Sequence, residues 1–461
     1  MKIAIIGTGY VGLTLSALLA RVGYKTYCID VDKKKIDTIK KGKSYFYELG
    51  LDTLVKYGIQ SGNLIPTLDY KEGLSDVDVV FLCVGTPSGP SGGFDLRYIF
   101  EAVEGAVKYI KDGTIFVQRS TVPVGTGREA MRRIKRVNPK LKFAYLSSPE
   151  FLREGAAVLD SIIQDRIVIG GDDREAKRKV FKIFEKIEFL ADDIISKNPE
   201  ISMYASNNVH NNNRKDVEFN KKCMSTKLES AELIKVCSNT MLAMKISYAN
   251  NIARICDKVD ANVTEVMDGV GMDRRINRSF LYAGIGFGGG CFPKDVNGLI
   301  KSLEEHDVDA TLFKAILQVN MEQVDFVLQK IEDMGTSPKS KVGVLGLSFK
   351  PGTSDMRMSP AGRLCKALVK KGYSVVGYDP EAIEEAKLEF PEEKGLVYSE
   401  DVDEVFKGSE IVVVATDWPQ FKELDFEYLS TLMKEKRLLD ARNYLDVEYM
   451  SNIFKFDNLG A

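Results

Sequence analysis

The sequence predicts an α/β protein in which two doubly wound sheet domains are joined by a central helical domain with one long spine helix. Apolar strand-like runs alternate with helical segments between Lys2 and Ile169, which is the pattern of a parallel sheet covered on both faces. A similar pattern returns after Lys341, and the segment between the two is mostly helical. At about 150 residues per domain, a chain of 461 residues also fits three domains.

The first domain is expected to cover residues 1–191. Its candidate strands are short, continuously apolar runs, as strands buried on both faces of a sheet are. These strands are Lys2–Ile6, Lys25–Ile29, Val77–Val84, Thr114–Gln118, Phe143–Leu146 and Arg166–Ile169. Helical segments lie between most of them, so a parallel sheet is expected.

Residues 192–224 form a polar stretch with no clear periodicity, which we interpret as a surface insertion. Its asparagines are Asn207, Asn208, Asn211, Asn212, Asn213 and Asn220. The central helical domain is expected over residues 225–334. Within it, Leu228–Asp260 has apolar residues at helical spacing and no proline, which predicts a long spine helix that joins domains and can pair with a second chain.

The third domain, residues 335–461, repeats features of the first. KVGVLGL near its start resembles KIAIIGTG near the start of the chain, and GYSVVGYDPE resembles GYKTYCIDVD. This self-similarity predicts an internal duplication and a second doubly wound domain. LGLSFKPGTSDMR replaces the glycine motif of the first domain, so a ligand other than a dinucleotide is expected here.

The composition excludes several classes of function. Lys plus Arg is 64 and Asp plus Glu is 66, a net charge of −2 that gives no support to nucleic-acid or membrane-surface binding. Two histidines, His210 and His306, argue against a Ser-His-Asp triad and a histidine-rich metal site, so no metal is expected. Seven dispersed cysteines without a CxxC pair predict reduced thiols and a cytoplasmic protein. Neither a signal peptide nor an apolar run of roughly 18 residues, as in a membrane helix, is found.

The first candidate site is a dinucleotide-binding loop. Gly7, Gly9 and Gly12 form a GxGxxG motif that follows a strand and opens a helix, which brings free N–H groups to a pyrophosphate. Asp30 ends the second strand, where a carboxylate accepts hydrogen bonds from ribose hydroxyls and repels a 2′-phosphate. This context predicts a Rossmann-like domain that binds NAD rather than NADP. For Lys35, a cofactor contact and an ordinary solvated lysine remain equally open.

Two later strands of the first domain end in CVGTP and RSTVPVGTG. Ligands of open α/β sheets bind beyond the carboxyl ends of the strands, which places Thr86, Ser120 and Thr121 along the cofactor cleft. Taken singly, each of these residues is more often a helix cap or a turn residue.

The most informative segment is AGIGFGGGCFPKDVNGLIKSL, from Ala283. Its closely spaced glycines are expected to leave the backbone exposed for a ligand. Pro293 and Asp295 predict the first turn of a helix, so Cys291 would lie at a helix N-terminus beside Lys294. Both features lower the pKa of a thiol and favour the nucleophilic thiolate, whereas the other six cysteines are interpreted as packing residues.

A thiolate beside a nicotinamide favours covalent aldehyde chemistry, in which the thiol adds to an aldehyde, hydride leaves to NAD and water cleaves a thioester. Lys235 and Asn239 are spaced to share one face of the long helix. Glu150 and Glu154, in SSPEFLREGA, have the same spacing, and Asp295 lies one turn beyond the cysteine. Exposed lysines and glutamates on helices are otherwise usually only solvated.

At these residues the sequence resembles the UDP-glucose/GDP-mannose dehydrogenase family. The resemblance covers nearly the whole chain except the polar insertion and rests on GTGYVG, VGTP, STVPVGT, SPEFLREGA, AELIKVCSN, GMDRRINRSFLYAGIGFGGGCFPKD, LGLSFKPGTSDMR and DARNYLD. It implies an enzyme that oxidises the C6 alcohol of a nucleotide sugar to a carboxylate with two NAD. It also implies that the third domain holds the nucleotide and that the long helix builds a homodimer or larger homo-oligomer.

The resemblance implies roles for individual residues. Cys291 would be the nucleophile, Lys235 would stabilise the oxyanion, and Asp295 would assist proton transfer. Glu150 and Thr121 would position or activate the hydrolytic water. The substrate would touch Phe151, Leu152, Lys235, Asn239, Phe280, Leu281, Tyr282, Ala283, Gly284, Gly288 and Lys350, with Arg275 reaching in from a neighbouring chain. The cofactor would meet Tyr10, Val11, Asp30, Lys35, Thr86, Thr121, Glu154, Lys294 and Arg357.

The chain departs from the family pattern at three positions near this site. Gly290 stands before the cysteine where a serine is frequent, and Asn277 and Ser354 replace a frequent glycine and a frequent aspartate. The CFPKD form nevertheless favours UDP-glucose as the substrate and UDP-glucuronate as the product. The same chemistry on GDP-mannose or a UDP-N-acetylhexosamine is the alternative.

An alternative of another class is a non-catalytic sensor of NAD or nucleotide sugars. The complete set of Cys291, Lys235, Asn239 and Asp295 argues against it, because a binding module has no need of a reactive thiol.

Overall fold

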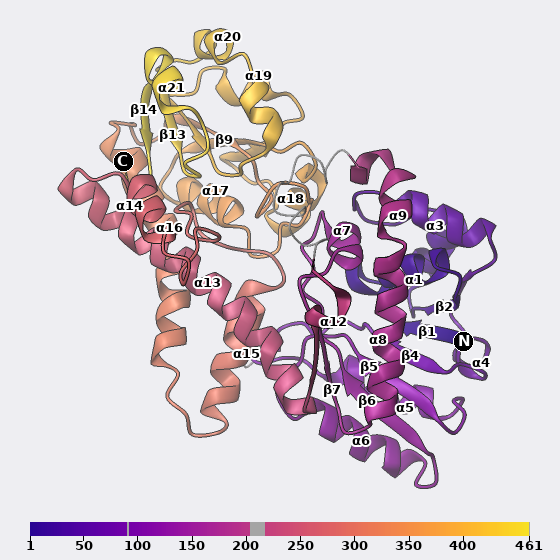
Figure 1. The fold of residues 1–461 in the computed structure, drawn as a ribbon. Helices are drawn as coiled ribbons and strands as arrows, with labels where there is room; N and C mark the ends of the chain where they lie inside the picture. The colour runs from indigo at the N-terminus through magenta and orange to yellow at the C-terminus, as the bar shows by residue number, and fades with distance from the viewer. Residues whose placement is uncertain (90–91, 203–216, 461) are drawn as a thin grey trace. The chain divides into compact units, whose positions relative to one another are not determined.

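Figure 1 shows the computed structural model, which describes residues 1–89, 92–202 and 217–460. The chain forms two compact units, Met1–Cys237 and Ser238–Ala461. Each unit contains one doubly wound sheet, and a helical region lies between the two sheets in the sequence. The predicted fold class is therefore confirmed.

Unit 1 holds an eight-stranded sheet in the order β3-β2-β1-β4-β5-β6-β7-β8. The strands are β1 (Lys2–Ile6), β2 (Lys25–Ile29), β3 (Leu64–Thr67), β4 (Val79–Leu82), β5 (Thr114–Gln118), β6 (Phe143–Ser147), β7 (Ile167–Gly170) and β8 (Cys223–Thr226). The first strand lies inside the sheet and pairs in parallel with β2 and β4. The strand order reverses beside β1, which is where doubly wound sheets bind their ligands.

The sequence missed two strands of this sheet and the direction of its far edge. β3 contains Pro66, and β8 is an edge strand whose Met224 and Ser225 are exposed, so neither forms a continuous apolar run. β7 pairs antiparallel with β6 and parallel with β8. The expectation of a parallel sheet is therefore wrong for its last two strands, because apolar periodicity reports burial and not strand direction.

Helices cover both faces of the sheet in unit 1 (Figure 1). They are α1 (Tyr10–Arg21), α2 (Lys33–Lys40), α3 (Leu51–Gln60), α4 (Tyr70–Leu74), α5 (Arg97–Val107), α6 (Thr126–Val137), α7 (Ala157–Ile162), α8 (Arg174–Phe189), α9 (Ala191–Ser196) and α12 (Phe219–Lys222). Ile3 and Ile5 of β1 pack into one apolar layer, whereas Ala4 and Ile6 pack into the other. Burial on both faces explains why the strands show as continuous apolar runs in the sequence.

The polar stretch is more regular at its described ends than the sequence suggests. Helix α9 lies at its beginning, and α12 and β8 lie at its end. Asn198 is buried, and its amide donates a hydrogen bond to the carbonyl of Gly50 at 3.0 Å. The expectation of an irregular insertion is wrong for these ends. Asn207, Asn208, Asn211, Asn212 and Asn213 lie outside the described residues.

Helix α13 (Leu228–Val259) confirms the predicted spine helix. The boundary between the two units falls inside it, so Lys235 belongs to unit 1 and Asn239 to unit 2. The helical region continues with α14 (Val263–Gly271), α15 (Phe292–Glu304) and α16 (Thr311–Asp333). Across the described ranges, no helix combines the length and the apolar character needed to cross a membrane.

Unit 2 holds a six-stranded parallel sheet in the order β11-β10-β9-β12-β13-β14. The strands are β9 (Lys341–Leu345), β10 (Ser374–Tyr378), β11 (Leu396–Tyr398), β12 (Ile411–Val414), β13 (Arg437–Asp440) and β14 (Lys455–Asn458). The helices of this sheet are α17 (Pro360–Lys370), α18 (Ile383–Glu389), α19 (Val402–Phe406), η1 (Pro419–Glu423), α20 (Phe426–Thr431) and α21 (Val447–Ile453). β9 pairs with β10 and β12 as β1 pairs with β2 and β4, which confirms the predicted second doubly wound sheet.

Candidate active site

The glycine motif and Asp30 meet at the carboxyl ends of β1 and β2, as the sequence predicts. Gly9 is the N-cap of α1, so the first N–H groups of that helix are free for a ligand. Asp30 accepts hydrogen bonds from the N–H of Thr8 at 2.8 Å and from its hydroxyl at 2.7 Å. Burial opposes ionisation of Asp30, but these hydrogen bonds, the N–H of Asp32 and the charge of Lys35 lower its pKa. The carboxylate is thus held ionised beside the loop.

Gly9 and Gly12 are glycines for different physical reasons. A Cβ on Gly12 would lie 1.9 Å from the carbonyl oxygen of Gly7, so the turn itself requires this glycine. A Cβ on Gly9 would meet no atom of the protein within 4 Å. The space above Gly9 is what the close approach of a dinucleotide pyrophosphate needs, so the loop fits NAD.

Replacing each of the two glycines with alanine should therefore affect a different property of the protein. The Gly9→Ala variant should unfold at the wild-type temperature yet bind NAD at least about tenfold more weakly, because its methyl group occupies the ligand's space. The Gly12→Ala variant should lose thermal stability, because its methyl group overlaps the backbone of Gly7. Thermal unfolding and calorimetric titration with NAD measure both effects. Wild-type affinity in Gly9→Ala would show that the cofactor does not approach this loop.

Aromatic residues that the sequence analysis did not select pack over the same loop. The Tyr45 hydroxyl donates to the carbonyl of Thr8 at 2.9 Å, and the Tyr10 and Phe46 rings lie 4.1 Å apart. The ammonium of Lys35 lies 5.0 Å from the centre of the Tyr45 ring. The run YFY in the sequence is the signal that could have marked this segment. Lys35 and Tyr10 are thus next to the glycine motif, where a cofactor contact was predicted.

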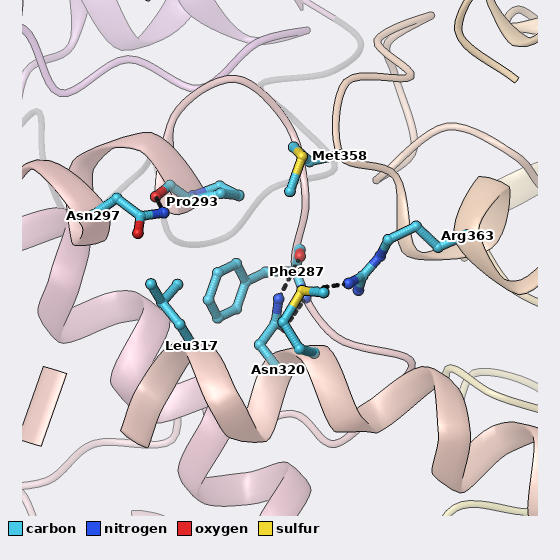
Figure 2. A pocket seen from close by; sticks show the side chains of 8 residues that line it. Phe287, Pro293, Asn297, Leu317, Asn320, Met358 and Arg363 are labelled. Carbon is cyan, nitrogen blue, oxygen red and sulfur yellow. Dashed lines mark hydrogen bonds between the residues drawn. The ribbon is translucent and has the colours of Figure 1, made fainter. Parts of the chain in front are cut away.

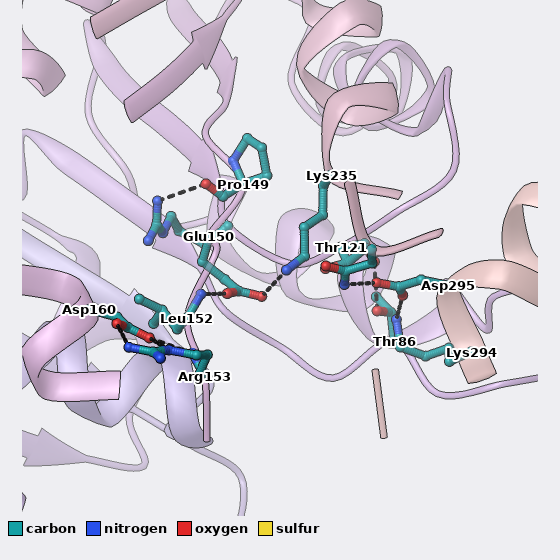
Figure 3. A network of polar contacts seen from close by, with 12 residues as sticks. Thr86, Thr121, Pro149, Glu150, Leu152, Arg153, Asp160, Lys235, Lys294 and Asp295 are labelled. Carbon is teal, nitrogen blue, oxygen red and sulfur yellow. Dashed lines mark hydrogen bonds and ion pairs between the residues drawn. The ribbon is translucent and has the colours of Figure 1, made fainter. Parts of the chain in front are cut away.

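The loops that follow β4 and β5 are joined at the predicted cofactor residues. The Thr86 hydroxyl donates to the carbonyl of Thr121 at 2.7 Å (Figure 3). The Ser120 hydroxyl donates to the carbonyl of Val84 at 2.7 Å. Thr86, Ser120 and Thr121, which were predicted to line the cofactor cleft, therefore lie together in the structure.

Glu150 and Lys235 form an ion pair within unit 1. Their side chains are 10% and 4% exposed, and the ammonium lies 3.0 Å from a carboxylate oxygen (Figure 3). Burial alone would raise the pKa of Glu150, but the charge of Lys235 and the N–H of Leu152, at 2.6 Å, lower it. The ring of Phe151 lies 5.6 Å from the ammonium. Sequence reasoning selected both members of this pair but not their contact.

Arg119 is a buried cation that the sequence analysis did not select. Its guanidinium donates to the carbonyls of Ser148 and Pro149 at 3.0 and 3.2 Å and also faces Glu150, lowering the pKa of that acid further. It therefore fixes the backbone of the SSPE segment that carries Glu150. A charged residue directly after a strand of apolar residues was the available signal.

In unit 2, Cys291 is exposed and is the N-cap of α15, as predicted. Asp295, in the first turn of this helix, is 1% exposed. Its carboxylate accepts from the amide of Asn239 at 2.6 Å and from the ammonium of Lys294 at 2.6 Å (Figure 3). The structure thus groups three predicted residues of this unit and directs Lys294 toward Asp295.

The glycine run before Cys291 is packed rather than exposed, which corrects the expectation. A Cβ on Gly288 would lie 2.5 Å from the carbonyl oxygen of Met358, and one on Gly290 would lie 2.5 Å from the guanidinium of Arg357. The N–H of Gly289 donates to the carbonyl of Arg357 at 2.8 Å. These glycines are therefore needed for close contact with the loop before α17. Gly290 in particular leaves room for the guanidinium of Arg357.

The backbone is unusual at the start of the predicted substrate segment 280–284 and just before it. Phe280 adopts φ +66° and Asn277 adopts φ +63°, a region in which asparagine replaces glycine at low cost but phenylalanine is strained. The ring of Phe280 lies 6.3 Å from that of Phe292, which follows the cysteine. Arg275 is exposed and pairs with Asp273 at 2.6 Å.

The other residues predicted to touch ligands are spread over both units. Leu281, Ala283 and Gly284 are buried, Tyr282 is exposed, and Lys350 lies 5.7 Å from the Phe349 ring. A cavity of about 200 Å³ opens beside the glycine run (Figure 2). It is lined by Phe287, Pro293, Asn297, Leu317, Asn320, Met321, Met358 and Arg363. The sequence marked Pro293 only as the start of a helix and assigned none of these residues to a ligand.

Asp379 is the residue of the second sheet that corresponds to Asp30, and its carboxylate is already hydrogen-bonded to protein groups. Asp379, after β10, is 1% exposed and accepts from the N–H of Leu347 at 2.7 Å, from both donors of Ser348, and from the Trp418 indole at 3.0 Å. A carboxylate surrounded by protein donors is not available to a ribose. This agrees with the expectation that this sheet binds a ligand other than a dinucleotide.

Three domain models of the UDP-glucose/GDP-mannose dehydrogenase family match the chain. The NAD binding domain matches residues 1–188, the central domain matches residues 229–322, and the UDP binding domain matches residues 343–447. The matches follow the order of the first sheet, the helical region and the second sheet.

Individual relatives match the chain from end to end. A UDP-glucose 6-dehydrogenase of Rhizobium meliloti (strain 1021) is 38% identical over 100% of this chain and 99% of its own length. A UDP-glucose 6-dehydrogenase of Rickettsia prowazekii (strain Madrid E) is 35% identical over 100% of both chains. The structure of a UDP-glucose dehydrogenase from the hyperthermophilic archaeon Pyrobaculum islandicum superimposes with a TM-score of 0.86 at 30% identity, covering 100% of this chain and 97% of that one.

Proposed function

Because this chain belongs to the UDP-glucose/GDP-mannose dehydrogenase family and is an NAD-dependent nucleotide-sugar dehydrogenase, we propose that it oxidises UDP-glucose to UDP-glucuronate. The full-length relatives named as UDP-glucose 6-dehydrogenases support this choice of sugar. The observation that carries the chemistry is Cys291, an exposed thiol at the N-terminus of a helix in the segment GGGCFPKD. Such a position favours the thiolate, which is the reactive form.

The proposed reaction has two oxidations and one hydrolysis. In the first, the C6 alcohol loses a hydride and a proton and becomes an aldehyde. The thiolate of Cys291 then forms a carbon–sulfur bond with the aldehyde carbon, and the oxyanion takes up a proton to give a thiohemiacetal. NAD, when bound, would accept one hydride in each oxidation, so two NAD are used per sugar. Loss of the second hydride and of the hydroxyl proton leaves a thioester.

Water completes the reaction by attacking the thioester carbonyl. The carbon–sulfur bond breaks, the thiolate of Cys291 leaves, and the sugar carboxylate is formed. We assign Lys235 to stabilise the developing oxyanion and Asp295, with Asn239, to assist proton transfer. Glu150 and Thr121 hold and orient the water. The lowered pKa of Glu150 keeps it an ionised acceptor at neutral pH, as this role requires.

The second sheet and the spine helix complete the proposal. The third domain holds the nucleotide, which is supported by its match to a UDP binding domain and by the engaged Asp379. The chain forms a homodimer or larger homo-oligomer in the cytoplasm, where reduced thiols persist. No disulfide joins any two of the seven cysteines, all of which lie in the described ranges, and this is consistent with such a compartment.

The test is the ratio of reduced cofactor to sugar. With limiting UDP-glucose and excess NAD, two NADH should form per sugar, because both oxidations occur before the product leaves. Absorbance of the reduced cofactor measures the ratio, and chromatography identifies the carboxylate. GDP-mannose and UDP-N-acetylglucosamine are the comparison substrates. One NADH per sugar, with an aldehyde as the product, would contradict the thioester route.

A further inference from the structure

Glu232 is a buried acid that the reaction above does not use. It lies on α13 and is 2% exposed. One carboxylate oxygen accepts from the N–H of Gly125 at 2.8 Å, and the other accepts from the N–H of Gly127 at 2.8 Å. The amide of Gln118 approaches the second oxygen at 3.4 Å. Within the described ranges, no cation forms an ion pair with Glu232. A buried carboxylate is costly unless its hydrogen bonds serve the fold or the site.

The two glycine N–H groups belong to the loop that leads from β5 into α6. Gly125 is the N-cap of α6, with φ +91°. The first N–H groups of a helix have no partner within the helix and bind a carboxylate well. A Cβ on Gly127 would lie 2.8 Å from Leu228 and 3.1 Å from the Glu232 carboxylate, so α6 and α13 are in close contact here. Glu232 therefore fastens the far end of this loop to α13.

The near end of the loop is fastened to the strand beside it. The N–H of Ser120 donates to the carbonyl of Leu82 at 3.1 Å, and Thr86 donates to the carbonyl of Thr121. Thr121 lies between the two attachments. Its position is thus set by the β4 edge on one side and by Glu232 on the other.

The same helix carries Lys235, three residues after Glu232. Residues at this spacing lie side by side on one helix surface. Glu232 bonds the loop of Thr121, and Lys235 bonds Glu150 at 3.0 Å. Helix α13 is therefore the common support of the two loops that carry Thr121 and Glu150.

We propose that Glu232 is a positioning residue that holds Thr121 and Glu150 at fixed positions relative to each other for hydrolysis of the thioester. The inference rests on the proposed function, because it concerns one step of that reaction. The ionised form is the active one, since each oxygen accepts from a different N–H group. Protonation turns one acceptor into a donor that faces an N–H group, and the loop loses half of its attachment.

The surroundings of Glu232 place its protonation in the neutral range. Burial raises the pKa of Glu232 to about 7, although Gly127, Gly125 and Gln118 donate to it, and Glu229 raises it further. Tyr145 of β6 faces it and donates to Gln118 at 2.8 Å, and burial raises the pKa of this phenol, so it stays neutral. Glu229 is itself paired with Arg128 of α6 at 2.7 Å. Hydrolysis should therefore slow as the pH falls through about 7.

The Glu232→Gln variant tests the proposal, because it removes the charge with little change of shape. Its kcat should fall by on the order of 10- to 100-fold with little change in KM for UDP-glucose, as expected for misplaced groups. A burst of two NADH per site should precede slow turnover, and a covalent adduct on Cys291 should accumulate in intact-protein mass spectra. The kcat of the variant should no longer fall as the pH falls through about 7. Glu229→Gln, one turn earlier, is the control. Its kcat above about pH 8 should match the wild type without an accumulated adduct, and its pH profile should keep its shape but move to slightly lower pH, because Glu229 no longer raises the pKa of Glu232.

A fall in kcat without an adduct, or an unchanged pH profile, would overturn the role of Glu232. If the variant does not fold, the wild type provides the second measurement. Its adduct fraction during turnover should be larger one unit below pH 7 than one unit above, and equal fractions would overturn the proposal. The two proposals fail separately: one NADH per sugar from the wild type contradicts the thioester route, whereas two NADH with an adduct-free Glu232→Gln contradicts only the positioning role.

Discussion

Replacing Cys291 with serine should reduce formation of the sugar carboxylate by about a thousandfold or more, with NAD affinity unchanged. A serine hydroxyl is not ionised at neutral pH and is a far weaker nucleophile than a thiolate. The side chain is exposed at the N-cap of α15, so the replacement should not disturb packing. The glycine motif belongs to the other unit, so the cofactor loop is not altered. Product formation and calorimetric titration with NAD measure the two effects.

Cys237→Ser is the matched control for that experiment. Cys237 is the other exposed cysteine of the chain and has no part in the proposed chemistry. Its replacement should leave turnover within about twofold of the wild type. Full activity in Cys291→Ser, or equal losses in the two variants, would contradict covalent catalysis by Cys291.

Replacing Lys235 with methionine should damage both catalysis and folding. The variant keeps the volume but leaves Glu150 buried without its ammonium partner, which costs about 3–5 kcal/mol for a buried pair. Turnover should fall by on the order of 100- to 1,000-fold, because the oxyanion loses its cation. The pKa of Glu150 is lower in the folded state than in the unfolded state. The ion pair therefore adds to the free energy of unfolding of the wild type at pH values above the ordinary pKa of a carboxyl group, and this contribution is lost as the pH falls through the folded-state pKa. Urea denaturation followed by circular dichroism, and steady-state kinetics, measure the two losses.

The double variant Lys235→Met with Glu150→Gln separates those losses. Removing the unpaired charge should restore most of the free energy of unfolding, whereas turnover should stay low. Equal stability of Lys235→Met and the wild type would show that the ion pair contributes nothing to folding.

The sequence predicts the sheets well where strands are buried on both faces. β1 and β5 are buried along nearly their whole length and have the predicted bounds, as does β2, which is buried except near its start. β8 is an edge strand whose two central residues are both exposed, and its pattern cannot be told from that of a polar loop. The antiparallel pairing of β7 with β6 depends on how the chain returns to the sheet, which no local pattern records.

The candidate site was predictable as a set of residues but not as a set of contacts. The spacing of Lys235 and Glu150 on separate elements says nothing about their ion pair. Glu232 was missed because its neighbours in the sequence do not show that it is buried, whereas Arg119 was missed although it follows an apolar strand directly. The glycines before Cys291 were interpreted as open to a ligand, whereas Gly288 closes on the carbonyl of Met358. A glycine needed for packing and one needed for ligand approach look the same in a single sequence.

The indole of Trp418 and the carboxylate of Asp379 have a consequence for how repeated folds diverge. Asp30 and Asp379 each accept from the N–H and the hydroxyl of a residue in the turn after the first strand of their sheet, and the Trp418 indole at 3.0 Å is an added donor in the second sheet. The same strand order can therefore leave this acid beside a ligand loop in one sheet and enclose it among protein donors in the other. Topology alone thus does not decide which ligand a doubly wound sheet binds.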